Sequence, residues 1–262
     1  MTELTPEAPL TRPIRILAIA AHHDDLEFGP VGSICRWTDE GAEVTYCIVT
    51  DGSAGSNDPA VNIQELVALR KQEQLAAAAI AGVKEVRFLG YQDGTLQPTL
   101  ELRRDLTRLI RELRPDRVVS NDPTTVLVEN RYINHPDHRA VAEAALYAVF
   151  PSAESRPIFP ELLDEGYEPH KVAELYLGFS MEPTVFVDTS STLDRKIQAL
   201  ACHASQLGEE VLNMVRQWNT EGGEPFGVGA AESFRVMRFI EEEVEEEPTL
   251  DEAEKATAES PA

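Results

Sequence analysis

The sequence predicts an α/β fold: a Rossmann-like, mostly parallel sheet with helices on both faces, in a single domain with a C-terminal elaboration. Apolar runs that suit strands alternate four times with helical stretches over residues 14–120, and this alternation is typical of a parallel sheet covered by helices. The 262 residues, 42% of them hydrophobic, suffice for one substantial soluble domain. We expect that domain at 14–240, after a flexible leader at 1–13 and before an acidic, disordered tail at 241–262.

Each expected element rests on a local pattern. Strands are expected at apolar or β-branched runs, and helices at amphipathic or alanine-rich stretches that stop at glycines such as Gly41 and Gly82. In the first half we expect strands at 14–21, 43–50, 85–89 and 116–120, with helices ending at about 40, 81 and 113 between them. In the second half we expect a helix at 140–150, an irregular excursion at 151–170, strands at 172–177 and 184–187, and helices at 191–205 and 207–218.

The charge of the chain restricts its partners. The formal net charge is −23, and residues 241–262 hold ten acidic residues and one lysine, a charge of −9 that leaves −14 for the rest. Because both parts are acidic, we expect neither nucleic acid nor an anionic membrane surface as a partner. The glutamate-rich tail is too polar to bury a core.

Cysteine usage and the N-terminus suggest a cytoplasmic protein. The three cysteines, Cys35, Cys47 and Cys202, are widely spaced and form no CxxC pair, so a disulfide framework or a zinc–thiolate site is not expected. Residues 1–13 contain no apolar signal segment, and the first hydrophobic run is too short to span a membrane.

Two short polar motifs carry the candidate chemistry. The first follows the apolar run 14–21 directly and reads His22-His23-Asp24-Asp25. In open α/β sheets ligands bind at the carboxyl ends of strands, and two adjacent carboxylates need a cation or a shared proton. The alternative is a polar turn that merely leaves the sheet.

The second motif, His135-Pro136-Asp137-His138, opens a helical stretch. Proline favours the first helical position, and the spacing of three places both histidine rings near the same side of the helix start. The alternative is a capped helix with incidental histidines, although four of the six histidines lie in these two clusters. Together the motifs offer His, Asp and His ligands, a set typical of catalytic zinc with an open position for water.

These motifs resemble the signatures of the LmbE/PIG-L family of zinc-dependent de-N-acetylases. The first family signature, Ala-His-Pro-Asp-Asp-x-Glu, corresponds to residues 21–27, and the second, His-Pro-Asp-His, is unchanged at 135–138. Weaker matches extend the resemblance from about Ile14 to Phe239. It therefore covers nearly everything except the leader and the tail.

The resemblance implies roles for six residues. The implied zinc ligands are His22, Asp25 and His138. Asp24 would be the general base that deprotonates water as it attacks the acyl carbonyl. His135, kept protonated, would stabilise the oxyanion, and Asp137 would hold its ring and favour the imidazolium form. Ferrous iron is the other candidate metal.

Two positions depart from the family pattern. His23 replaces the usual proline, and we expect its side chain to point away from the metal because alternate residues at a strand end face opposite sides. In the thiol-sugar branch a tyrosine stands two positions before the second motif, where this chain has Ile133, with Tyr132 one residue earlier. The position that holds the tyrosine in that branch therefore has no hydroxyl group here.

Arg70 and Asp93 are the candidate substrate-binding residues outside the motifs. Arg70 could reach a hydroxyl or an anionic group of the substrate, or could simply pair with a glutamate on its helix. Asp93 could accept hydrogen bonds from sugar hydroxyls, or could simply make an Asp-Gly turn. His203 is expected to pack between helices rather than to act in catalysis.

We therefore predict a zinc-dependent hydrolase that removes an N-acetyl group from an N-acetylglucosamine-type sugar or sugar conjugate, a small-molecule substrate, and that acts as a homo-oligomer. Three rivals remain: a zinc amidase for larger amide conjugates, a magnesium-dependent phosphatase or phosphoacceptor domain, and a non-catalytic metal- or sugar-binding relative. The phosphatase would give His135 and His138 no role.

Overall fold

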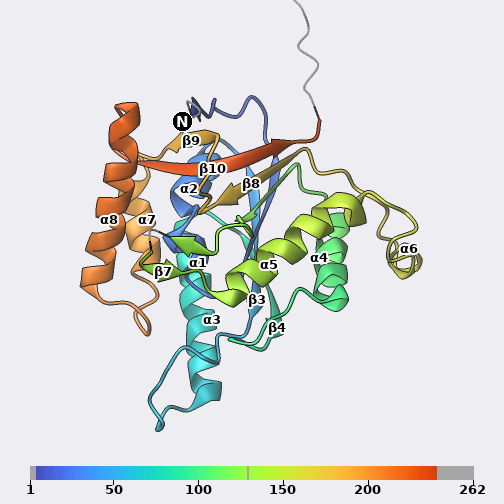
Figure 1. Cartoon of the computed structure of the whole chain (residues 1–262), viewed down its shortest axis with the longest axis horizontal. Coiled ribbons are helices and arrows are strands. Elements are labelled where there is room, and N and C mark those ends of the chain that lie inside the picture. The colour runs from blue at the N-terminus through green and yellow to red at the C-terminus, as the bar shows by residue number, and fades with distance from the viewer. Residues whose placement is uncertain (1–3, 129, 241–262) are drawn as a thin grey trace, which may run out of the picture.

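An eight-stranded sheet forms the centre of the computed structural model, which describes residues 4–128 and 130–240 (Figure 1). Its spatial order is β1-β9-β10-β8-β5-β2-β3-β4. Strands β4, β3, β2, β5 and β8 run parallel, whereas β10 is antiparallel to both β8 and β9. The strands are β1 (Thr5–Pro6), β2 (Arg15–Ala20), β3 (Glu43–Thr50), β4 (Glu85–Tyr91), β5 (Arg117–Asn121), β8 (Glu174–Gly178), β9 (Val185–Asp188) and β10 (Ala231–Arg238). The expected α/β class with a mostly parallel sheet is confirmed.

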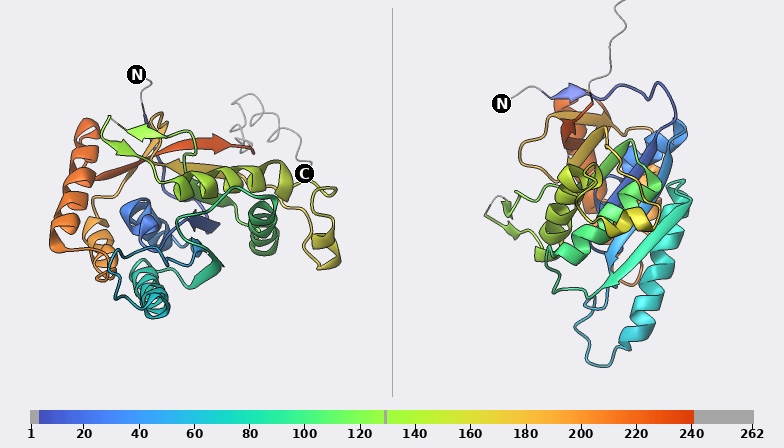
Figure 2. Two further views of the ribbon diagram at one scale, coloured as in Figure 1. Left: turned by 60° about the horizontal axis from the view of Figure 1, so that its bottom comes forward. Right: turned by 90° about the vertical axis from the view of Figure 1, so that its right-hand side faces the viewer.

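Helices lie on both faces of this sheet (Figures 1 and 2). The α-helices are α1 (Asp25–Phe28), α2 (Val31–Asp39), α3 (Ile63–Ile80), α4 (Leu100–Leu113), α5 (Pro136–Tyr147), α6 (Glu161–Asp164), α7 (Leu193–Leu200) and α8 (Glu209–Gly223). Shorter elements are the π-helical turn Ala148–Ala153, the 3-10 turn Glu224–Phe226 and a separate hairpin of β6 (Leu127–Val128) and β7 (Tyr132–Ile133). Among the described helices, none combines the length and apolar character needed to span a bilayer.

The alternation of β2 explains why both faces are covered. Ile16 and Ala18 point into a core shared with α2, α3 and α7, whereas Leu17 and Ile19 point into a second core shared with α4 and α5. A strand that is buried on both faces reads as a continuous apolar run because every residue needs a hydrophobic partner. β2 is therefore the centre of the domain.

The strand order places the ends of β2 and β5 at a topological switch point. The parallel strands read β4-β3-β2-β5-β8 in space, so the connections leave β2 toward one edge and β5 toward the other. Such a reversal opens a crevice at the carboxyl ends of the strands. The run 22–25 follows β2, and the segment that leads to His135 follows β5.

Residues 5–7, within the expected leader, make contacts with the sheet. β1 pairs in parallel with β9. The Glu7 carboxylate accepts hydrogen bonds from Trp37 Nε1 at 2.8 Å, Arg117 Nη1 at 2.7 Å and the Tyr176 hydroxyl at 3.0 Å. The Arg117 guanidinium also lies 4.0 Å from the centre of the Tyr176 ring. Glu7 therefore supplies a counter-charge for the buried guanidinium of Arg117, and this contact ties the polar leader to the domain.

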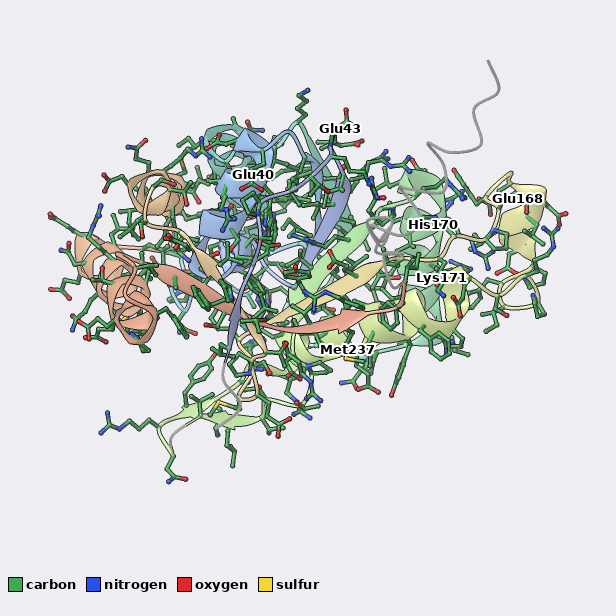
Figure 3. The ribbon with its side chains drawn as sticks, turned by 90° about the horizontal axis from the view of Figure 1, so that it is seen from above. Glu40, Glu43, Glu168, His170, Lys171 and Met237 are labelled. Atoms are coloured by element: carbon green, nitrogen blue, oxygen red, sulfur yellow. The ribbon has the colours of Figure 1, made fainter. Side chains whose placement is uncertain are left out.

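We expect Glu7→Ala to lower the free energy of unfolding by about 2–3 kcal/mol. The substitution removes the carboxylate that accepts from the buried guanidinium of Arg117 and from the indole N–H of Trp37. Urea unfolding midpoints measure the change. Glu43, the exposed first residue of β3 (Figure 3), offers the matched control, and Glu43→Ala should stay within about 0.5 kcal/mol of wild type. Equal midpoints for Glu7→Ala and wild type would show that the leader adds nothing to stability.

The remaining expectations differ from the structure mainly after residue 120. β10 was not expected, and it lies between β8 and β9 rather than at an edge. The helix expected to open at the second motif does begin at Pro136, with His135 as its N-cap, and it ends at Tyr147, whereas the helix expected at 191–205 ends at Leu200. The expected disordered tail at 241–262 lies outside the described residues.

Candidate active site

The two histidine motifs meet at the carboxyl edge of the sheet. The chain turns at His22 after β2, and Asp24 precedes the short helix α1. His135 is the N-cap residue of α5, with Pro136 at its start. Because β2 and β5 are neighbours, the loops that follow them share one crevice. Figure 1 shows α1 and the start of α5 near one another.

Three candidate metal-binding side chains converge there. The Asp25 carboxylate lies 3.0 Å from His138 Nε2 and 3.5 Å from His22 Nδ1, and these two nitrogens lie 3.1 Å apart. A tetrahedral zinc ion with bonds of roughly 2.0–2.1 Å separates its ligand atoms by about 3.3–3.4 Å. Two imidazole nitrogens and one carboxylate at such distances could hold one divalent ion.

Other groupings are possible around the same ring. Ring nitrogens of His22, His135 and His138 lie within 4.8 Å of one another, and so do the ligand atoms of His22, Asp93 and Asp137. The set with Asp25 pairs both histidines with one carboxylate, at 3.0 Å for His138 and 3.5 Å for His22.

Asn134 fixes the orientation of the His138 ring. Its side-chain Nδ2 donates to the Thr125 carbonyl at 2.8 Å, so its Oδ1 must accept, and this oxygen lies 3.1 Å from His138 Nδ1. The proton of a neutral His138 therefore lies on Nδ1, and Nε2 presents its lone pair to the cluster. Outer partners of this kind orient metal-binding histidines.

We expect Asn134→Leu to weaken metal binding by roughly 10- to 100-fold, the usual cost of losing an outer partner. Metal titration with a competing chelator measures the affinity. Asn134→Asp keeps an acceptor for His138 and should lose much less. If the leucine variant binds metal as tightly as wild type, Asn134 does not set the ring orientation.

Two buried carboxylates face the other side of the His22 ring. His22 Nε2 lies 3.1 Å from Asp93 Oδ1 and 3.4 Å from Asp137 Oδ2. Burial lowers the pKa of His22, but the charge of Asp25 and the contacts with Asp137 and Asp93 outweigh it and raise the pKa to about 12. Backbone N–H groups of Gly94 and Leu96 hold Asp137 in place. Nδ1 of His22 is thus the nitrogen that faces Asp25 and His138.

In this structure the carboxylate of Asp137 faces His22 and not His135, whereas its backbone N–H donates to His135 Nδ1 at 3.2 Å. Burial and the charges of His22 and His138 lower the pKa of His135, and the charges of Asp137 and Asp93 raise it. The expected stabilisation of a His135 imidazolium by Asp137 stays a prediction. With Nδ1 accepting, the proton of the neutral ring lies on Nε2.

Asp24 occupies a strained backbone position. Its φ of 97° is in the left-handed region, which costs a non-glycine residue about 1–2 kcal/mol. Burial, followed by the neighbouring charge of Asp25, raises the pKa of Asp24 to about 7, although Arg70 opposes the shift. A carboxylate with a pKa near neutrality suits proton transfer, and strain of this kind often lies at functional sites.

Arg70 and His23 lie beneath this loop. Arg70 is 4% exposed, and its Nη1 and Nη2 donate to the carbonyls of Gly52 and His23. The same nitrogens lie 3.7 Å from Asp93 Oδ2 and 4.0 Å from Asp24 Oδ1. The His23 ring stacks on Phe88 with the centres 5.5 Å apart. Direct contact of Arg70 or Asp93 with substrate stays a prediction.

Asn134 and Gln74 are the residues of this region whose contacts the sequence analysis missed. Gln74 accepts a hydrogen bond from the Asp24 backbone N–H at 3.1 Å. For Gln74 the spacing was a signal, because it stands four after Arg70 on α3 and the two share a helix face. Asn134 lies before the N-cap of α5, so helical spacing gave no signal for it.

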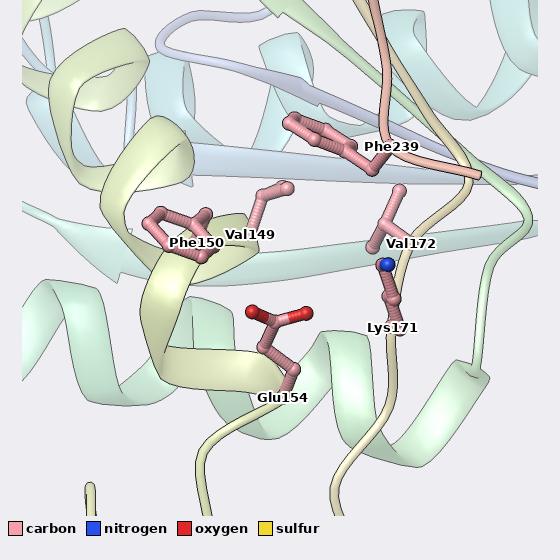
Figure 4. Close-up of a pocket in the computed structure, with 6 residues that line it drawn as sticks. All are labelled: Val149, Phe150, Glu154, Lys171, Val172 and Phe239. Carbon is pink, nitrogen blue, oxygen red and sulfur yellow. The ribbon is translucent and has the colours of Figure 1, made fainter. Parts of the chain in front are cut away.

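A separate pocket lies elsewhere. Figure 4 shows it lined by Val149, Phe150, Glu154, Lys171, Val172 and Phe239. The Phe239 N–H donates to the carbonyl of Ala173, which precedes β8, so this pocket is near the amino end of that strand. It contains none of the candidate site residues.

Comparison with known proteins identifies the family. The family described as "PIG-L: GlcNAc-PI de-N-acetylase" matches residues 17–149, half of the chain and a stretch that includes both histidine motifs. The chain belongs to the PIG-L family. The resemblance inferred from residues 21–27 and 135–138 is thereby confirmed.

Relatives of this PIG-L chain are named as deacetylases. It is 35% identical over 198 residues to diacetylchitobiose deacetylase of Thermococcus kodakarensis, covering 75% of this chain and 72% of the relative. It is 31% identical over 209 residues to a probable N-acetyl-α-D-glucosaminyl L-malate deacetylase 2 of Bacillus anthracis, covering 78% and 86%. The solved N,N'-diacetylchitobiose deacetylase of Pyrococcus horikoshii, a complex with its inhibitor MPG, matches with a TM-score of 0.81 and 31% identity, covering 88% of this chain and 86% of that one.

Proposed function

We propose that this chain is a metal-dependent hydrolase that removes the acetyl group from an N-acetylglucosamine-type sugar conjugate. The observation that carries the proposal is the convergence of Asp25 with the ring nitrogens of His22 and His138, next to a second carboxylate, Asp24. Membership of a family whose relatives are named as amino-sugar deacetylases supports the same reaction.

His22, Asp25 and His138 would hold the metal. When bound, the ion polarises the acyl carbonyl and lowers the pKa of a water molecule. Two imidazoles and a carboxylate suit zinc, and the same set also suits ferrous iron. Asp93 and Asp137 hold His22 from behind, so that Nδ1 faces the cluster. Metal analysis of the protein purified without added metal decides between the two ions.

Asp24 would take a proton from the water molecule that attacks the acetyl carbon. As the C–N bond breaks, the same carboxyl group can return this proton to the sugar nitrogen. The second proton of the water leaves the acetic acid and protonates the amine, so the products are acetate and the ammonium form of the sugar amine, and atoms and charges balance. A group with a pKa near 7 can both accept and release the proton.

His135 would act as a neutral hydrogen-bond donor. Because its Nδ1 accepts from the Asp137 backbone, its Nε2–H is free to donate to the carbonyl oxygen as negative charge develops. Donors placed at such an oxygen stabilise the transition state more than the ground state. Arg70 and Asp93 would either contact the substrate or hold Asp24 and His22 in place. Loss of a substrate contact should appear in KM, whereas loss of positioning should appear in kcat, so variants of the two residues can separate these roles.

Acetate release tests the proposal directly. We expect the metal-loaded protein to release acetate from N-acetylglucosamine, N,N'-diacetylchitobiose or an N-acetylglucosaminyl conjugate, to lose activity in a chelator, and to regain it with zinc or ferrous ions. Release of amine only from bulky amides would indicate the amidase instead. Metal binding without turnover on any substrate would indicate a non-catalytic relative.

We also propose a cytoplasmic location, which the free cysteines Cys35, Cys47 and Cys202 support because they fit a reducing compartment. The homo-oligomer stays a prediction that light scattering can test.

A further inference from the structure

A buried line of polar side chains lies behind Asp24, and the proposed chemistry does not use it. Gln74 Oε1 accepts from the Asp24 backbone N–H at 3.1 Å, and Gln74 Nε2 lies 3.1 and 3.2 Å from the two oxygens of Glu27. Glu27 Oε2 lies 3.2 Å from His203 Nε2. The line thus joins the turn after α7 to the backbone of Asp24.

All three side chains are withdrawn from solvent. Gln74 and Glu27 are 0% exposed and His203 is 1% exposed. Burying such groups is costly unless their polar atoms are paired. Gln74 and Glu27 are paired through the contacts given above, and His203 is paired through Nε2, whereas its Nδ1 has no hydrogen-bond partner among the described residues. A chain that only needed to fill this space could use apolar residues at no such cost. These hydrogen bonds therefore indicate that the orientation of a polar group matters here, and not only the filling of space.

The direction of the Gln74 amide is determined by Glu27. A carboxylate can only accept, so the amide nitrogen of Gln74 must face Glu27 and its oxygen must face the Asp24 N–H. His203, with Nε2 toward Glu27, anchors the far end of the line. If the Gln74 amide were reversed, its NH2 group would face the backbone N–H of Asp24, and two donors would meet.

Asp24 needs support of this kind. Its φ of 97° is unfavourable for aspartate, and α1, which it precedes, has only four residues. So short a helix is not stable by itself. By contrast, α3, which carries Gln74, has 18 residues and a capped start at Asn62. The long helix can therefore hold the strained turn in place.

We propose that Gln74, held in turn by Glu27 and His203, is a positioning residue that keeps Asp24 in its left-handed conformation, so that its carboxylate meets the attacking water. This inference rests on the proposed function of Asp24 as the proton acceptor. Errors of about 1 Å at a catalytic group can cost roughly 100-fold in rate. The contribution of Gln74 should therefore appear in kcat and not in KM.

Exchanging the amide and the carboxylate tests the proposal. In Gln74→Glu two carboxylates face each other. In Glu27→Gln the new amide can turn its oxygen toward Gln74 Nε2 or toward His203 Nε2, and its NH2 group then meets the other donor. Each single variant should lower kcat by roughly 10- to 100-fold with KM and metal content unchanged. In the double variant Gln74→Glu/Glu27→Gln, the amide now at position 27 can donate to the carboxylate now at position 74 and accept from His203. We expect kcat to return to within about threefold of wild type, a strong departure from additivity.

Glu73→Gln is the matched control. Glu73 lies next to Gln74 on α3 and accepts from the backbone N–H and hydroxyl of Ser205 at 2.8 and 2.7 Å, but it does not contact Asp24. Its loss should lower the thermal unfolding midpoint and leave kcat near the wild-type value. A merely structural role of Gln74 would give the same pattern, with stability lost and kcat kept.

The outcomes separate the two proposals. If Asp24→Asn keeps full activity, the proposed function of Asp24 fails, whatever Gln74 does. If Asp24→Asn is inactive and the double variant is no better than the product of the single effects, only the positioning role of Gln74 is overturned. Recovery in the double variant supports it.

Discussion

Replacement of Asp24 by asparagine is expected to lower kcat for acetate release by about 10³-fold, within the range usually lost with a general acid–base group. Asparagine is nearly isosteric with aspartate and tolerates a positive φ, so the turn at φ 97° should persist. The amide cannot take a proton from water. Steady-state rates from an acetate assay, measured at saturating metal and substrate, give the change.

Metal content is the control for this variant. The contacts among Asp25, His22 and His138 do not involve Asp24, so Asp24→Asn should retain the metal stoichiometry of wild type. A variant that loses both metal and activity would assign Asp24 to the metal site. A variant with full activity would exclude Asp24 as the proton acceptor.

The parallel half of the fold was predictable because most of its strands, apart from the edge strand β4, are buried on both faces. β2 and β3 read as continuous apolar runs with turns at both ends, and α4 places its leucines on one face. β10 was not predictable in the same way. It reads Ala-Glu-Ser-Phe-Arg-Val-Met-Arg, and only its neighbours β8 and β9, brought together from elsewhere in the chain, make it a central strand.

For the site, the sequence predicted which residues lie close together, but not which of their side-chain groups face one another. His22 and His138 come together because their loops follow neighbouring strands. That Asp137 faces His22 instead of its own helix-mate His135 depends on the loop around Gly94, whose backbone N–H binds that carboxylate. Such contacts are set by loop conformation, which has no periodic signal in the sequence.

His138→Ala should have the largest effect on metal binding. It removes one of three candidate ligands and leaves the Asp25 carboxylate without its 3.0 Å partner. We expect the affinity to fall by more than the roughly 10- to 100-fold typical of an outer partner such as Asn134, and activity to fall with it. Chelator competition measures the affinity, and metal analysis after gel filtration measures the stoichiometry.

His170→Gln is the matched control because it removes a histidine that lies outside the site. His170 Nε2 lies 2.7 Å from the Pro115 carbonyl, before β5 and thus near the amino edge of the sheet. This variant should bind one equivalent of metal with wild-type affinity and keep its activity. If His138→Ala binds metal as tightly as His170→Gln, the ion is held elsewhere, and the grouping of His22 with Asp93 and Asp137 becomes the set to test by Asp93→Asn.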